Sequence, residues 1–390
     1  MTPNTLNCQY ADLCSACPWI DIDPQVQAHE KIKMFQDQME KAQISLPKFS
    51  QTNITFQKTA FDHFRDRLDF VIENGNIGLF SKKENRILDI ETCPLLTEPL
   101  QNLYHEFRKI KWPIQKGSFR LRVSFSGKKG AWLDFSNLDI KKLIEEKNCL
   151  SQLLDLVDVV EIGQKRKVLL RTLKLNDPHF EYWTRTWVSG QPLSLLSSVG
   201  SFSQAGDLPN QILTKIIEQF IPDRVHRMLE FGSGTGNLTF PALGPLDVHQ
   251  SNAQNPRQVV AVEYDPLACQ ALEQSAHRHG YNSETQKRLT VICGDFQRHH
   301  AFSSMNENFS FSDFDLVLVN PPRSGLMSFL DPLKETSKRP QYFIYMSCYL
   351  DSFTRDSVVL KDCGYSLDRV TLVDQFPHSP HFEIISLWKQ

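Results

Sequence analysis

Residues 228–237 read MLEFGSGTGN, an apolar segment that ends in glycines at alternate positions. Glycines in this arrangement allow a tight turn after a β-strand and let the main chain approach a ligand closely. A dinucleotide-binding fingerprint requires a third glycine three positions after the second, where this chain has Asn237. A phosphate-binding P-loop requires Gly-Lys-Ser or Gly-Lys-Thr, which is also absent. The stretch therefore predicts another kind of ligand loop, at the carboxyl edge of a parallel sheet.

The remainder of the C-terminal half alternates between short apolar segments and amphipathic ones. We expect strands at 228–231, 259–263, 289–293, 316–319, 343–346, 366–373 and 383–388, and helices that include 208–220 and 267–279. Alternating β and α segments with almost continuously apolar strands predict a doubly wound, mostly parallel α/β sheet. Residues 241–257 are rich in Pro, Gly, Asn and Gln and are expected to form a solvated insertion.

The N-terminal half follows a different pattern. It begins with a cysteine-rich segment over residues 1–20 and a predicted polar helix over residues 25–43. Short alternating segments then predominate, and Asn74-Gly75 between RLDFVI and IGLF predicts a β-hairpin. We expect a β-rich α+β domain over residues 1–195 and the α/β domain over residues 196–390. Further helices of the first domain are expected near 98–110 and 139–157.

The composition is that of an ordinary water-soluble chain of 390 residues. No apolar run approaches the ~20 residues that a transmembrane helix needs, and the start MTPN lacks the basic and apolar regions of a secretory signal. We therefore expect a cytoplasmic, monomeric protein with no membrane partner. In a reducing compartment its nine cysteines are expected to be ligands, nucleophiles or core thiols rather than disulfides.

A net charge of −2 excludes a uniformly basic nucleic-acid binder, but positive residues are concentrated locally. Residues 107–130 contain eight lysines and arginines and no acidic residue, with Trp112, Phe119 and Phe125 interspersed, and a second basic cluster covers 165–174. One interpretation is a solvated sheet face. The other is a surface that contacts nucleic-acid phosphates and stacks bases on its aromatic rings.

The glycine spacing resembles that of class I S-adenosylmethionine-dependent methyltransferases. The resemblance implies that Gly232 and Gly234 approach this cofactor at the end of the first strand. Glu263 ends the next strand, where it can accept hydrogen bonds from both ribose hydroxyls, and Asp295 ends the third strand, where it can lie beside the adenine. Each residue alone is compatible with a turn or a helix cap, but their order at successive strand ends indicates a cofactor site.

The residues at the ends of the fourth and fifth strands indicate which kind of nucleobase atom is methylated. Asn320-Pro-Pro-Arg323 lacks the aromatic residue that follows a similar motif in enzymes that methylate exocyclic amines. The Pro-Cys that cytosine-C5 RNA enzymes usually carry at this strand end is also absent. Cys348 ends the fifth strand. A cysteine at a strand end is commonly a packed thiol, but in the expected fold this strand end lies beside the methyl donor.

A thiol and a base together can solve the chemical problem that uracil presents. C5 of uracil is a weak nucleophile, and a thiolate that adds to C6 converts the ring into an enolate with charge at C5. After methyl transfer, a carboxylate removes the C5 proton and the thiol is eliminated. Residues 376–383 read FPHSPHFE and bring a carboxylate to the same rim. Cys348 is the expected nucleophile and Glu383 the expected base.

Together these motifs resemble the RNA 5-methyluridine (uracil-5) methyltransferase family. The segments that carry the resemblance are NPPR at 320–323, Ser347-Cys348 with Arg355-Asp356, FPHSPHFE, Gln204, and the cysteines Cys8, Cys14, Cys17 and Cys93. Cys8 lies almost at the start of the chain and leaves no room for the N-terminal β-barrel module of some relatives. Within the family the chain therefore resembles the compact bacterial 23S ribosomal RNA enzymes.

The resemblance implies a set of ligands. Gln204, Glu263 and Asn320 would contact S-adenosylmethionine, and a uridine flipped out of 23S ribosomal RNA would enter a pocket between the two halves. Arg65 and Arg67 resemble a family segment near the RNA site, with surface salt bridging as the alternative. The resemblance also implies that Cys8, Cys14, Cys17 and Cys93 bind a [4Fe–4S] cluster, whereas their spacing alone satisfies a structural zinc site equally well. The cysteines with no motif around them are expected to be core thiols: Cys149, Cys269, Cys293 and Cys363.

Three departures from the family pattern leave alternatives open. Tyr349 follows Cys348 where Asn is usual, Ala205-Gly206 follow Gln204 where a residue and then Asn are usual, and Gly232 replaces a common aromatic residue. Asn210 is a candidate to replace the missing asparagine. The alternatives to a 23S enzyme are the same chemistry on transfer RNA and a catalytically silent iron–sulfur RNA-binding protein.

Overall fold

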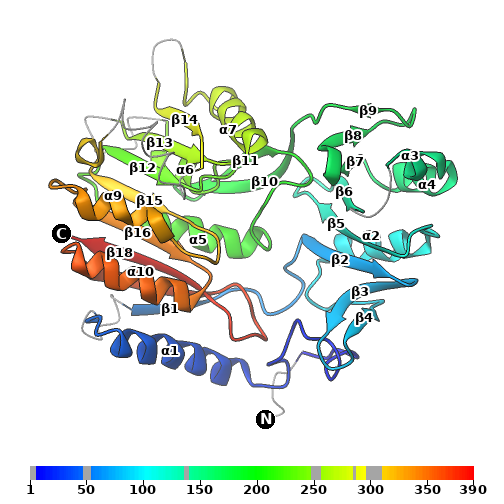
Figure 1. The fold of residues 1–390 in the computed structure, drawn as a ribbon, viewed down its shortest axis with the longest axis horizontal. Helices are drawn as coiled ribbons and strands as arrows, with labels where there is room; N and C mark the ends of the chain where they lie inside the picture. The colour runs from blue at the N-terminus through cyan, green and yellow to red at the C-terminus, as the bar shows by residue number, and fades with distance from the viewer. Residues whose placement is uncertain (1–5, 47–53, 136–139, 247–255, 284–286, 296–309) are drawn as a thin grey trace.

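The computed structural model describes residues 6–46, 54–135, 140–246, 256–283, 287–295 and 310–390 (Figure 1). Figure 1 shows strands β2 to β9 gathered on one side of the molecule and the C-terminal sheet, together with β1, on the other. Each half is built on an eight-stranded sheet, and a two-stranded hairpin forms a third, smaller sheet.

The C-terminal sheet contains the strands that the glycine loop and its neighbours predicted. Its members are β1 (Ile54–Lys58), β12 (Arg227–Phe231), β13 (Gln258–Glu263), β14 (Leu289–Cys293), β15 (Leu316–Val319), β16 (Tyr342–Ser347), β17 (Ser366–Asp374) and β18 (Glu383–Lys389). Their order is β1-β17-β18-β16-β15-β12-β13-β14, with β18 antiparallel to both neighbours and the other pairs parallel. All seven strands predicted for this half are present within one residue of the expected ends, so the α/β fold is confirmed.

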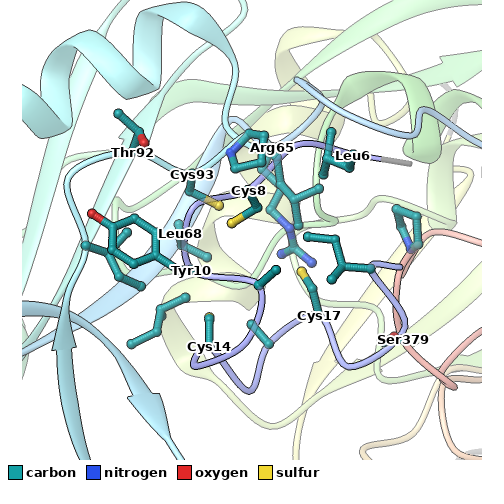
Figure 2. A pocket seen from close by; sticks show the side chains of 18 of the residues that line it. Leu6, Cys8, Tyr10, Cys14, Cys17, Arg65, Leu68, Thr92, Cys93 and Ser379 are labelled. Carbon is teal, nitrogen blue, oxygen red and sulfur yellow. The ribbon is translucent and has the colours of Figure 1, made fainter. Parts of the chain in front are cut away.

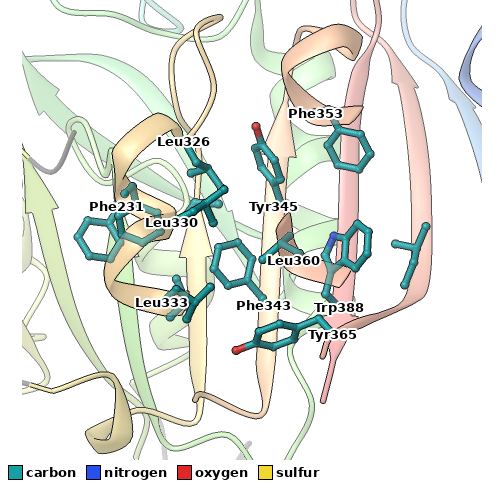
Figure 3. Packing of buried hydrophobic residues seen from close by; sticks show 14 of the residues in the cluster. Phe231, Leu326, Leu330, Leu333, Phe343, Tyr345, Phe353, Leu360, Tyr365 and Trp388 are labelled. Carbon is teal, nitrogen blue, oxygen red and sulfur yellow. The ribbon is translucent and has the colours of Figure 1, made fainter. Parts of the chain in front are cut away.

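Helices cover both faces of this sheet, and β16 supplies side chains to both layers. Phe343 and Tyr345 pack under α9 (Leu330–Glu335) and α10 (Leu350–Asp362), together with the short η2 (Phe311–Asp313) and η3 (Met327–Phe329) (Figure 3). Ile344 and Met346 belong to the opposite layer, with α5 (Asp207–Phe220), α6 (Thr239–Leu243) and α7 (Pro266–Arg278). Because successive side chains of a strand point to opposite faces, a fully apolar strand such as β16 must be covered on both.

Two early elements belong to the C-terminal sheet. β1 pairs in parallel with β17, with Ile54 opposite Val370. The predicted N-terminal helix, α1 (Pro24–Lys41), packs against α10, where the ring centroids of Phe35 and Phe353 lie 6.0 Å apart. The division of the chain at residue 195 stays our proposal. The structure adds to it that α1 and β1 cross from the first part to the second.

The N-terminal sheet is β-rich, as the sequence predicts. Its strands are β2 (Arg67–Glu73), β3 (Asn76–Ser81), β4 (Arg86–Asp89), β5 (Lys116–Val123), β6 (Lys129–Asp134), β7 (Val159–Ile162), β8 (Lys167–Leu169) and β9 (Leu175–Asn176). Its helices are α2 (Glu98–Lys109), α3 (Ile140–Glu145), α4 (Lys147–Leu156) and the short η1 (Gly163–Lys165). The predicted hairpin joins β2 to β3 through Asn74 and Gly75, whose φ angles of 52° and 83° are those of a type I′ turn.

The hairpin of β10 (Glu181–Val188) and β11 (Gln191–Ser197) links the two halves, and the amide of Leu196 donates to Ser275 Oγ of α7 at 3.0 Å. The expected solvated insertion is wrong at its start, because residues up to Leu243 form the buried helix α6. Pro241 lies in the first turn of α6, where proline is tolerated, and Gly244 ends it with a φ of 72°. Residues 247–255 of the expected insertion lie outside the described part of the chain.

Candidate active site and cysteine pocket

One cavity of about 740 Å³ lies at the carboxyl ends of the parallel strands. It is also lined by the segment that follows β11, and by Arg65 and Arg67 of the N-terminal half. Every residue that the sequence predicts for catalysis or for cofactor binding lines this cavity: Gln204, Gly232, Gly234, Glu263, Asp295, Asn320, Cys348 and Glu383. They come from seven different segments of the sequence, and the fold brings all of them to one place. This convergence is what their order at successive strand ends predicts; their individual roles stay predictions.

The glycine loop is fixed by Glu263. Its Oε2 accepts a hydrogen bond from the amide of Gly234 at 2.8 Å, and its Oε1 accepts one from the amide of Asp265 at 2.9 Å. Gly234 has a φ of 55°, and a side chain there would meet no atom within 4 Å. The glycine therefore permits the turn and also leaves open space for a ligand. Each carboxylate oxygen has a second lone pair, so Glu263 can hold the loop and still accept from ribose hydroxyls.

Asn210 supports the glycine loop from behind. It is 5% exposed, its amide donates to Asn237 Oδ1 at 2.8 Å, and the amide of Asn237 donates back to Asn210 Oδ1 at 2.7 Å. Asn210 also donates to the carbonyl of Arg185 at 2.7 Å. Asn210, the candidate to replace the missing asparagine, is therefore a buried residue that stabilises the glycine loop, and it does not line the cavity.

Cys348 and Glu383 emerge from adjacent antiparallel strands. Ser347 of β16 is paired with Ile384 of β18, so the next positions, Cys348 and Glu383, face each other at the end of the ladder. Burial raises the pKa of the Cys348 thiol, and the nearby Glu383 raises it further. Burial raises the pKa of Glu383 to about 8, and a hydrogen bond of 2.6 Å from Gln375 Nε2 to Glu383 Oε2 opposes that rise.

Arg323 and Gln375 are site residues that the sequence analysis did not identify. The Arg323 guanidinium lies beside Cys348, and its charge and hydrogen bond lower the pKa of the thiol against the effect of burial. Asp356 holds the loop that carries Arg323, because Asp356 Oδ2 accepts from the Leu326 amide at 2.7 Å and from the Tyr345 hydroxyl at 2.8 Å. The replacement of the expected aromatic residue by arginine was a signal that could have pointed to Arg323.

Comparisons with known proteins show which proteins this chain resembles in sequence and in fold. No family model matches the chain. An RNA methyltransferase of Bdellovibrio bacteriovorus is 40% identical over 390 residues, which cover 98% of this chain and 95% of that protein. The 23S rRNA (uracil(1939)-C(5))-methyltransferase of Neisseria lactamica is 23% identical over 98% of this chain and 81% of its own. The structure of the Pyrococcus abyssi tRNA (uracil-54, C5)-methyltransferase in complex with S-adenosyl-L-homocysteine matches with a TM-score of 0.65 at 16% identity, over 96% of this chain and 86% of that one, and so shares its fold.

The chain belongs to the RNA (uracil-5) methyltransferase family. It is accordingly an S-adenosylmethionine-dependent enzyme. The backbone of Tyr349, at the position where this family usually has Asn, is held by two neighbouring serines. Ser347 Oγ accepts from the Tyr349 amide at 3.3 Å, and the hydroxyl of Ser352 donates to the Tyr349 carbonyl at 3.1 Å. Tyr349 is the N-cap residue of α10 and provides no side-chain cap.

Most of the basic side chains singled out in this methyltransferase are engaged within the protein. Arg108, Lys109, Lys116, Arg120 and Lys128 form ion pairs with Asp89, Glu106, Glu73, Asp69 and Glu181. Arg166, Lys167 and Arg171 of the second cluster pair with Asp265, Asp177 and Asp155. Phe119 is a fully buried core residue. For these residues the structure favours a structural role over phosphate contact.

The mouth of the cavity offers a different surface to RNA. Phe202 is 70% exposed and lines the cavity, and the Arg67 guanidinium lies 5.4 Å from its ring centroid. Arg65 lines the cavity as well. An exposed aromatic ring next to arginines is the combination that stacks bases and contacts phosphates. Phe202, which lies two residues before Gln204, was not identified from the sequence.

The four cysteines of the family motif share a second cavity, of about 250 Å³ (Figure 2). Burial and the neighbouring thiols raise the pKa of Cys17 to about 12, and burial raises that of Cys93 to about 11. Arg65 lines this cavity also, and Figure 2 shows the Cys17 sulfur pointing toward its guanidinium group. Within the described residues, no three or more His, Cys, Asp or Glu side chains are grouped closely enough to hold a metal ion.

The donor set of this cavity fits either group, because four thiolates satisfy a structural zinc ion and also a [4Fe–4S] cluster. Of the other cysteines, Cys149, Cys269 and Cys363 are buried as expected, and Cys293 is exposed, which corrects its assignment as a core thiol. Cys293 is the last residue of the edge strand β14, which leaves its side chain less covered.

No helix in the described ranges combines the length and the apolar character required to cross a membrane.

Proposed function

We propose that this protein methylates C5 of a specific uridine in 23S ribosomal RNA, with S-adenosylmethionine as the methyl donor. The observation that carries the proposal is the single cavity in which the predicted cofactor residues meet Cys348 and Glu383. The names of the Neisseria relative and of other curated relatives, which are 23S rRNA (uracil-C5)-methyltransferases, support the choice of RNA. The name of the Pyrococcus structure favours transfer RNA as the alternative substrate.

The proposed chemistry assigns a step to each side chain. The Cys348 thiolate, which Arg323 stabilises, adds to C6 of uracil, and the resulting enolate attacks the sulfonium methyl group from C5. S-adenosylhomocysteine is the by-product. Glu383 then takes the C5 proton, and the electron pair of that C–H bond expels the Cys348 thiolate and restores the aromatic ring. A base with a pKa of about 8 is well matched to this work near neutral pH.

The cavity also fits the cofactor and a flipped base. Its volume of about 740 Å³ is in the range of pockets that hold drug-sized ligands. Gly232, Gly234 and Glu263 line one part of it, and Cys348, Glu383 and Arg323 line another. We infer that the adenosine occupies the first part and that the uracil, extruded from its stack, enters the second. Phe202 and Arg67 at the mouth then receive the flanking nucleotides.

We further propose that Cys8, Cys14, Cys17 and Cys93 hold a [4Fe–4S] cluster, with structural zinc as the alternative. The four thiols around one cavity support it, because burial raises the pKa values of Cys14, Cys17 and Cys93, and thiolates at these positions require a compensating cation. Bound there, a cluster would order the N-terminal segment and position the RNA site rather than transfer electrons. Iron, zinc and sulfide analysis of anaerobically purified protein, with the visible absorption spectrum, distinguishes the two metals.

The decisive experiment supplies labelled S-adenosylmethionine and unmodified ribosomal or transfer RNA under anaerobic conditions. We expect label in 23S RNA only; label in transfer RNA alone supports the alternative substrate, and no label supports a silent binding protein. Cys348→Ala should abolish both turnover and the covalent adduct with 5-fluorouridine RNA. Glu383→Gln should accumulate a covalent protein–RNA adduct, and normal product release by this variant would refute the role of Glu383. Cys149→Ala, a buried cysteine of α4 outside both cavities, is the matched control.

A further inference from the structure

The segment that joins β17 to β18, residues 375–382, separates the two cavities; we call it the base loop because Glu383 follows it directly. Gln375 and Phe376 line the catalytic cavity. Phe376, Pro377, Ser379 and His381 line the cysteine pocket. The base loop is therefore a shared wall, and its first residue, Gln375, holds the carboxyl group of Glu383 through a hydrogen bond of 2.6 Å.

Both backbone polar groups of His378, in the middle of the base loop, are bound by the N-terminal segment. The amide of Trp19 donates to the His378 carbonyl at 2.8 Å, and the His378 amide donates to Gln27 Oε1 at 2.8 Å. His378 is fully buried and has a φ of 63°, a conformation that residues other than glycine rarely adopt. Such a conformation persists only where the surroundings impose it. The contacts from Trp19 and Gln27 do so here, together with Phe61, whose carbonyl lies 3.0 Å from His378 Nε2.

A buried lysine fixes the start of the same loop. Lys31 of α1 is fully buried, and its Nζ donates to Asp374 Oδ1 at 2.6 Å and to the Phe376 carbonyl at 3.1 Å. Gln27, one turn earlier on α1, completes its bonds by donating to the carbonyls of Trp19 and Ile22 at 2.9 and 2.8 Å. Burying an ammonium group is costly unless its geometry is well satisfied. An apolar pair would hold the helix equally well, so a structural role alone does not require this arrangement.

We propose that residues 17–31 form a latch that positions the base loop, and that Gln27 and Lys31 act through this latch as positioning residues for Glu383. The inference rests on the proposed role of Glu383 as the base. The latch begins at Cys17, a wall residue of the cysteine pocket, so it ties that pocket to the carboxyl group. The nucleophile Cys348 directly follows β16 and has no bond to the latch among the described residues. Loosening the latch therefore impairs proton removal more than thiol addition.

Two variants of the full chain test the latch. Gln27→Met removes the acceptor for the His378 amide, and Lys31→Met combined with Asp374→Leu removes both charges without leaving one unpaired. We expect amide hydrogen exchange of the base loop to accelerate about tenfold or more, because one hydrogen bond to that segment is lost. We also expect covalent protein–RNA adduct to accumulate in the presence of S-adenosylmethionine, while binding of S-adenosylmethionine and exchange in β12 and β13 stay unchanged.

Lys361→Met is the matched control, because Lys361 also bonds a main-chain carbonyl next to α1, that of Gln43 at 3.0 Å, on the exposed side. Unchanged exchange in the base loop of both variants overturns the latch. If exchange in the base loop accelerates but the variants turn over at the wild-type rate and form no adduct, the latch does not position Glu383. The same conclusion follows if the variants also lose S-adenosylmethionine binding. Glu383→Gln is measured alongside: if it forms no adduct, the role of Glu383 itself is wrong, and the exchange and turnover data then judge the latch alone.

Discussion

Replacing Gln375 by methionine should move the pH dependence of proton removal to higher pH. Burial raises the pKa of Glu383 to about 8, so about a tenth of the carboxyl groups are ionised at pH 7 and about nine tenths at pH 9. The hydrogen bond from Gln375 Nε2 to Glu383 Oε2, which is 2.6 Å long, stabilises the ionised carboxylate of Glu383. A hydrogen bond to a charged group contributes about 1.5–3 kcal/mol, and 1.36 kcal/mol corresponds to about one pKa unit. Gln375→Met should therefore raise the midpoint by about one to two pH units.

The assay follows the proton itself. RNA that carries tritium at C5 of its uridines releases the label to water when Glu383 removes it, and methyl incorporation reports the earlier step. In a single turnover, the rate of release should rise with pH in both proteins, with the variant slower at pH 8 and recovering at higher pH. Methyl incorporation should not slow in the variant, because a protonated Glu383 no longer raises the pKa of the Cys348 thiol. An unchanged midpoint of release in Gln375→Met, or an equal loss of both steps at every pH, refutes the reasoning.

Three further substitutions test individual contacts. Arg323→Met should raise the pKa of the Cys348 thiol further and slow its alkylation at pH 8 by about tenfold for each pKa unit; an unchanged alkylation rate argues against thiolate stabilisation. Tyr349→Asn should provide the missing N-cap of α10 and increase the free energy of unfolding by about 0.5–1 kcal/mol in denaturant titration; no gain means that the serines already satisfy the turn. Glu263→Gln should weaken S-adenosylmethionine binding by about tenfold in calorimetry, because the amide nitrogen of glutamine cannot accept one of the two main-chain hydrogen bonds that hold the glycine loop.

The sequence predicted the C-terminal sheet well because its strands are buried on both faces. Leu316–Val319 and Tyr342–Ser347 are buried at every position, and such short apolar runs have clear ends. The predicted cofactor residues Gly232, Glu263 and Asn320 could be proposed for the same reason, since they lie at strand ends, whereas Gln204 came only from the family resemblance. The roles of Arg323 and Gln375 could not be predicted from the sequence, because they depend on contacts with Cys348 and Glu383 that form only in the folded protein.

The basic patch shows the same limit. Arg120 lies directly opposite Asp69, and Lys116 directly opposite Glu73, in the register of β5 and β2. The acidic partners are about fifty and forty residues away in the sequence, so a run of lysines and arginines without acids looked unneutralised. Pairing between strands decides the charge of such a surface, and the sequence alone did not show which strands pair.

The parallel pairing of β1 with β17 has a consequence for how the chain is made. Ile54 leaves the ribosome about three hundred residues before its partner Val370. At the usual synthesis rate of about 5–20 residues per second, the first strand waits roughly 15 s or longer. During that time its hydrogen-bonding edge has no native neighbour, and the nascent methyltransferase must keep it from pairing elsewhere. Completion of the sheet is thus among the last events of biogenesis, after most of the polypeptide has been translated.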